Sequence, residues 1–143
     1  MPTLDVRAYA RDTALQYDID VIATEIGTGR NHALLQGLAD AGVSKVQAIN
    51  ASLCVDGHDP KPFGRSLFTP APGAQVIIVD EVSWLTDSAR AWALEQIIAH
   101  SAEVPFVLSE SIYAGSTAET IRGALSPVFS QRVREIRLVH SNI

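Results

Sequence analysis

The chain has a single cysteine, no long uninterrupted apolar run and no excess of basic residues. Cys54 is the only cysteine among the 143 residues, so an internal disulfide is excluded, and no N-terminal apolar stretch has the length of a signal peptide or a membrane span. The formal net charge of -5 disfavours a domain that grips a nucleic-acid backbone, because that contact requires a clustered positive face. We therefore expect a cytoplasmic protein with a protein partner, no membrane attachment and no direct sequence-specific nucleic-acid binding.

Metal and nucleophile patterns are also missing. The histidines have neither an i,i+4 spacing nor cysteine neighbours, and the serines lack the glycine-flanked setting of a nucleophilic serine. We expect no metal site, no bound cofactor and no catalytic residue among them. The four histidines are His32, His58, His100 and His140.

The pattern of apolar residues predicts one α/β domain over residues 1–143, with a parallel sheet between two layers of helices. Apolar runs bounded by turn residues alternate with amphipathic segments of helical length, which is typical of a parallel sheet covered by helices. The expected strands are Val21–Ala23, Lys45–Ile49, Gln75–Asp80, Pro105–Ser109 and Val133–Val139. The expected helices are Leu4–Tyr17, a segment after Gly29 that ends at Gly42, Thr86 or Asp87 to His100, and Thr117–Leu125.

Two of these helices have a predicted inward face. In the first, the apolar positions are Ala33, Leu34, Leu38 and Ala41, and Gly42 stands where a left-handed C-terminal cap is expected. In the second, the corresponding positions are Ala89, Trp92, Ala93 and Ile97. The proline-rich stretch Ala51–Gly73 is expected to be mostly loop.

The turn after the first strand stands where a phosphate-binding loop would lie. A working loop reads GxxxxGK(S/T), in which backbone amides and a lysine hold the phosphates and a hydroxyl holds magnesium. Here the stretch is Thr24-Glu25-Ile26-Gly27-Thr28-Gly29-Arg30-Asn31. Arg30 replaces the lysine and Asn31 replaces the hydroxyl, so this predicts a degenerate nucleotide site around Gly27 and Gly29. The alternative is an ordinary glycine turn between a strand and a helix.

An apolar strand that ends in two acidic residues follows further along the chain. The run Val76-Ile77-Ile78-Val79-Asp80-Glu81 has the form of a Walker B segment, where the aspartate organises magnesium and the glutamate polarises the attacking water. Apolar strands ending in acidic residues are common, so an ordinary strand is the alternative. Without the upstream lysine, Asp80 and Glu81 would have no nucleotide to act on.

From Val76 the sequence VIIVDEVSWLTDSARAWALEQIIAHSAEVPFVLSES resembles the AAA+ domain of bacterial clamp-loader subunits. The resemblance places Ser109 and Ser111 at the sensor position that follows the Walker B strand. The tail Ser130–Leu138 is similar to the segment that carries the arginine finger of this family, with wider spacing and no cysteine. Arg132 and Arg134 are therefore candidates for an arginine finger or a partner contact.

Within that family, the chain is most similar to the first domain of the DNA polymerase III delta subunit, with delta-prime second. That domain has no working phosphate loop, and its Ser-Leu-Phe segment enters the hydrophobic pocket of a sliding clamp. Ser66, Leu67 and Phe68 have the matching place here, with Phe63 nearby. The resemblance implies an exposed segment that binds the clamp, and the alternative is that Leu67 and Phe68 fold back over the core.

Together these observations predict a binding domain without ATPase activity that modulates a sliding clamp in DNA replication by opening, unloading or blocking it. We expect no lid or collar domain, a size that would suit a small phage modulator. Two other functions stay open. One is a decoy that docks on a clamp-loader subunit through Arg132 and Arg134, and the other is a divergent nucleotide hydrolase that uses Arg30, Asp80 and Glu81.

Overall fold

In the part of the chain that the structure describes, five parallel strands form one sheet in the order β2 (Val46–Asn50), β3 (Val76–Asp80), β4 (Phe106–Ser111), β1 (Ile19–Thr24) and β5 (Val133–Arg137). The computed structural model describes residues 6–12, 14–24, 30–50, 68–80, 87–111 and 133–137. In these ranges the elements are α1 (Val6–Asp12), β1 (Ile19–Thr24), α2 (Arg30–Asp40), β2 (Val46–Asn50), β3 (Val76–Asp80), α3 (Asp87–His100), β4 (Phe106–Ser111) and β5 (Val133–Arg137). The predicted α/β class is confirmed.

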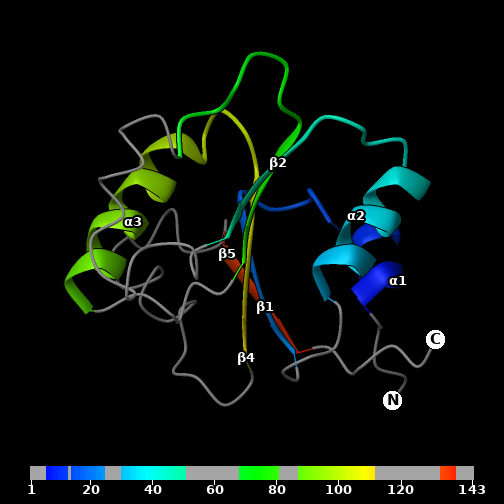
Figure 1. The fold of residues 1–143 in the computed structure, drawn as a ribbon, viewed down its shortest axis with the longest axis horizontal. Helices are drawn as coiled ribbons and strands as arrows, with labels where there is room; N and C mark the ends of the chain where they lie inside the picture. Colours follow the sequence, from blue (N-terminus) through cyan, green and yellow to red (C-terminus); the bar gives the residue numbers. More distant parts are fainter. Residues whose placement is uncertain are drawn as a thin grey trace.

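The helices cover both faces of the sheet. Figure 1 shows α3 on one side of the strands and α1 with α2 on the other, so the described elements form three layers. Parallel neighbours require crossover connections, and helices on both faces bury the strands on both sides. In β3, Val76 to Val79 are all buried, as the uninterrupted apolar run predicted.

Alternating side chains of the sheet feed two separate apolar clusters. On the α3 side, Ile77 and Val79 pack with Ile97 and Phe106, whereas Val76 and Ile78 belong to the cluster under α1 and α2. The predicted inward residues of α3 are confirmed, because Ala89, Ala93 and Ile97 are buried and Trp92 packs against the same cluster. The same holds in α2 for Ala33, Leu34 and Leu38.

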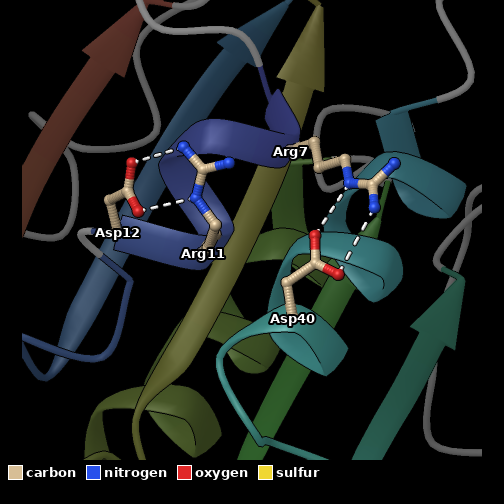
Figure 2. Close-up of polar contacts among 4 residues, drawn as sticks. All are labelled: Arg7, Arg11, Asp12 and Asp40. Carbon is tan, nitrogen blue, oxygen red and sulfur yellow. Dashed lines mark hydrogen bonds and ion pairs between the residues drawn. The ribbon is translucent and has the colours of Figure 1, made fainter.

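Helices α1 and α2 approach each other closely at Gly37. A Cβ added there would lie 2.3 Å from the carbonyl oxygen of Arg7 and 2.6 Å from the Cβ of Ala10, so the contact requires glycine. Beside this contact, Arg7 binds Asp40 through two hydrogen bonds of 2.8 and 3.3 Å (Figure 2). The hydrogen bond from Arg7 lowers the pKa of Asp40 below its ordinary value of 3.8.

The ends of the strands differ from the expected bounds by one or two residues, and two expectations about the helices are wrong. The first helix was expected to run to Tyr17, but α1 ends at Asp12, and residues 14–18 form a turn in which Leu15 has a φ of 72°. That left-handed residue redirects the chain into β1, which a continued helix would not do. The expected burial of Ala41 is also wrong, because α2 ends at Asp40 and Ala41 is exposed.

Gly42 has a φ of +84°, which confirms the predicted left-handed cap. The predicted helix Thr117–Leu125 and the last two residues of the strand predicted over Val133–Val139 lie outside the described residues. In the part of the chain that the structure describes, no helix has the length and apolar character needed to cross a membrane.

Candidate functional site

The carboxyl ends of three neighbouring strands meet at one edge of the sheet. β3 ends at Asp80, and β1 and β4 end in register, with Thr24 opposite Ser111. In open α/β sheets, ligands bind at this edge. α2 begins at Arg30, so Arg30 and Asn31 form its first turn, the position at which a phosphate loop meets its helix.

Ser109 and Asp80 are brought together at this edge. Ser109 is fully buried on β4, and its hydroxyl donates a hydrogen bond to Oδ1 of Asp80 on the adjacent strand. The resemblance placed Ser109 at a sensor position but did not specify a contact with Asp80. Asp80 is partly exposed, and Oδ1 of its carboxylate accepts this hydrogen bond from a neutral donor. Gly27, Gly29 and Glu81 lie outside the described residues.

Phe68 is part of the core, and the expectation of an exposed Phe68 is wrong. Its side chain is 2% exposed, and its ring packs edge-on against Trp92 of α3 with centroids 5.9 Å apart. Burying a phenylalanine side chain removes a large apolar area from water, which favours this position over an exposed one. The alternative arrangement, in which the residue folds back over the core, is the one that Phe68 adopts. Phe63, Ser66 and Leu67 lie outside the described residues.

The backbone after Phe68 is held by the side chain of Gln47 on β2. The Gln47 amide nitrogen donates to the carbonyl oxygen of Thr69 at 3.0 Å, and its oxygen accepts from the amide of Ala71 at 2.8 Å. One side-chain amide thus satisfies a donor and an acceptor of the passing chain, as a neighbouring strand would. No pattern in the sequence indicated this contact.

Arg134 binds an aspartate of its own domain. Its Nε donates to Oδ1 of Asp20 at 3.1 Å and its Nη2 donates to Oδ2 at 2.8 Å, which is a two-point ion pair between β5 and β1. An arginine finger or partner contact through Arg134 would therefore compete with Asp20, whose buried charge requires this partner. Asp20 and Arg134 are each the second residue of their strands, so this ion pair lies near the amino ends of the strands. Asp80 lies at the opposite, carboxyl ends. Arg132 lies outside the described residues.

Two tyrosines complete this cluster. The Tyr9 hydroxyl donates to Oδ2 of Asp20 at 2.5 Å, and the Arg134 guanidinium carbon lies 5.8 Å from the ring centre of Tyr9 and 4.6 Å from that of Tyr17. Burial, followed by the charge and hydrogen bond of Asp20, raises the pKa of Tyr9 well above its ordinary value of 10.0. Burial lowers the pKa of Arg134, but the hydrogen bond and charge of Asp20, with the two tyrosines, outweigh it and raise that pKa.

The sequence interpretation missed Asp20 and Tyr9. The available signal was a charged residue inside the apolar run Ile19–Ala23, because a charge in a buried strand requires an internal partner.

Comparisons with known proteins establish the fold. No family model matches the sequence, and no curated protein matches it. Among solved structures, the chain is similar to a structure describing katanin self-assembly, with a TM-score of 0.57 and 18% identity over 86% of this chain and 41% of that one. It is also similar to domain III of the Thermotoga maritima replication initiation protein DnaA, with a TM-score of 0.52 and 13% identity over 92% of this chain and 59% of that one.

A third similar structure is Drosophila ORC bound to AT-rich DNA and Cdc6, with a TM-score of 0.51 and 14% identity over 87% of this chain and 25% of that one. These neighbours are AAA+ ATPase domains, so the chain has the fold of a P-loop AAA+ domain. It spans between 25% and 59% of their lengths. At these identities the similarity concerns the fold.

Proposed function

We propose that this chain is an AAA+-fold binding domain of DNA replication that does not hydrolyse ATP. The observation that carries the proposal is which residues stand at the position of the nucleotide site. Asp80 stands at the expected strand end, yet α2 begins with Arg30 and Asn31 where a nucleotide site needs lysine and a hydroxyl. Arginine does not reproduce the compact ammonium of lysine, and Asn31 lacks the hydroxyl that holds magnesium in a working loop. The fold is therefore retained while the phosphate and magnesium contacts are lost.

The partner that we propose is a sliding clamp, contacted by the segment from Phe63 to Phe68. The resemblance to clamp-loader delta subunits supports this choice, and one of the structural neighbours, DnaA, is a replication initiation protein by name. Because Phe68 is buried, we assign different roles to Phe68 and Leu67. Phe68 anchors the segment to α3, Gln47 fixes the backbone that follows, and Leu67, which precedes the anchor, makes the apolar contact with the clamp.

The test is direct binding of the purified chain to a bacterial sliding clamp. Leu67→Ala is expected to weaken binding by at least about tenfold, as truncation of an interface anchor does. Leu35→Ala is the matched control, because Leu35 is an exposed leucine on α2, on the opposite side of the sheet from α3. Equal binding by wild type and Leu67→Ala, or no binding by the wild type, would contradict the clamp as the partner.

A second candidate function is a divergent P-loop hydrolase, and the hydrogen bond between Ser109 and Asp80 favours it. In such an enzyme, Asp80 would hold magnesium and Glu81 would polarise water. ATP turnover that requires magnesium and is lost in Glu81→Gln would support this function. The decoy function through Arg132 and Arg134 is disfavoured, since a partner would have to take Arg134 from Asp20.

A further inference from the structure

The last strand of the described sheet is attached at a buried charge. Asp20 is 1% exposed and accepts hydrogen bonds from Tyr9 on α1 and from both Nε and Nη2 of Arg134 on β5. A buried carboxylate that loses its cationic partner is strongly unfavourable. The residue of β5 that stands opposite Asp20 must therefore carry a positive charge and a planar pair of donors, which arginine alone supplies.

The sequence of this region offers a second arginine for that place. Arg132 lies two residues before Arg134, and Arg137 lies three residues after it. Side chains of a strand alternate between the two faces of the sheet, so a slip by two residues keeps every side chain on its own face. In that slipped register, Arg132 would stand opposite Asp20.

The neighbouring core positions decide between the two registers. In the observed register, Arg134 is opposite Asp20, and Ile136 is opposite Ile22, which is completely buried. The slipped register would place Arg134 opposite Ile22, in the apolar cluster under α1 and α2, without a carboxylate. In the observed register, Asp20 is thus paired with an arginine, and the position opposite Ile22 is not occupied by one.

We propose that Asp20 sets the register of β5 by selecting Arg134, with Tyr9 holding the carboxylate in place from α1. The arginine is then a positioning residue for the strand. This assignment depends on the geometry of β1 and β5 and is independent of the partner or of any nucleotide. It predicts that, when Arg134 is replaced, β5 shifts by two residues so that Arg132 stands opposite Asp20.

Arg134→Ile in the full chain tests this directly. In the slipped register of this variant, Arg132 would stand opposite Asp20 and the new isoleucine opposite Ile22, while Gln131 would stand opposite Ile19, where Val133 is now buried. Backbone NMR contacts between β1 and β5 should move by two residues, with Asp20 adjoining Arg132. Retention of the wild-type register in Arg134→Ile would overturn the proposal.

The control removes the charge that drives the slip. Asp20→Leu combined with Arg134→Ile has no buried carboxylate, so β5 should keep the wild-type register. A slip in this double variant as well would show that Asp20 does not select the register, and would overturn the proposal.

A second measurement applies if Arg134→Ile does not fold. Arg134→Lys keeps the charge but loses the two-point contact, so amide hydrogen exchange in β5 should become about tenfold faster while exchange in β2 is unchanged. Unchanged exchange in β5 would contradict the selection of arginine by Asp20.

Discussion

Two aspartates of the same sheet, Asp20 on β1 and Asp80 on β3, are held in different ways. Asp20 is buried and bound by a guanidinium and a phenol, whereas Asp80 is partly exposed and accepts a hydrogen bond from the neutral hydroxyl of Ser109. The first carboxylate is paired with a cation inside the domain, and the second lies at the carboxyl ends of the strands, where ligands of such sheets bind. The comparison teaches that a carboxylate in a strand is a functional candidate only after its internal partners are known.

The largest difference should come from removing the cations available to Asp20. Arg132→Gln combined with Arg134→Gln leaves the carboxylate buried without a cation, and the free energy of unfolding should fall by about 3–5 kcal/mol. Denaturation in urea, followed by circular dichroism, measures this loss. Arg11→Gln is the control, because Arg11 pairs with Asp12 at the surface, and its denaturation midpoint should match that of the wild type (Figure 2). If the double variant were as stable as this control, Asp20 would not depend on a cation, and the difference that we infer between the two aspartates would be wrong.

A smaller loss is expected at the second carboxylate. Ser109→Ala removes one hydrogen bond to an aspartate that water can still reach, so unfolding should become easier by about 1 kcal/mol. The same urea experiment measures it, and a cycle with Asp80→Asn isolates the pair. A loss as large as that of the arginine double variant would mean that Asp80 is held as Asp20 is.

The dependence of the folded state's stability on alkaline pH should test the role of Tyr9 beside Asp20. The pKa of Tyr9 is raised in the folded state, so its contribution to stability is complete below the unfolded pKa of about 10 and is lost as pH rises through the higher folded pKa. The urea midpoint of the wild type should therefore fall above about pH 10. In Tyr9→Phe this part of the fall should be absent, and an identical fall in both proteins would contradict the role of Tyr9.

The strands and helices could be predicted where the sequence pattern is local. The uninterrupted run Val76–Val79 indicates a strand buried on both faces, and the spacing of Ala89, Ala93 and Ile97 gives the inward face of α3. The end of α1 was missed because the turn depends on Leu15, which adopts a left-handed conformation that its residue type does not favour.

The candidate site was predictable only in part, for a physical reason. The resemblance indicated the strand that ends at Asp80 and the strand that carries Ser109, but their contact depends on β3 and β4 being neighbours in the sheet. Asp20 and Arg134 are 114 positions apart in the sequence, and their contact depends on β5 lying beside β1. Phe68 was expected at the surface because the resemblance implied an exposed clamp-binding segment, yet its contact with Trp92 forms only when the segment packs against α3.

The central claim is that this AAA+ fold binds without hydrolysing ATP, and ATP turnover in the presence of magnesium tests it most directly. The purified chain should release no phosphate beyond the level of a matched preparation of Glu81→Gln. Turnover by the wild type that disappears in Glu81→Gln, or when magnesium is removed, would contradict the claim and establish the hydrolase in its place.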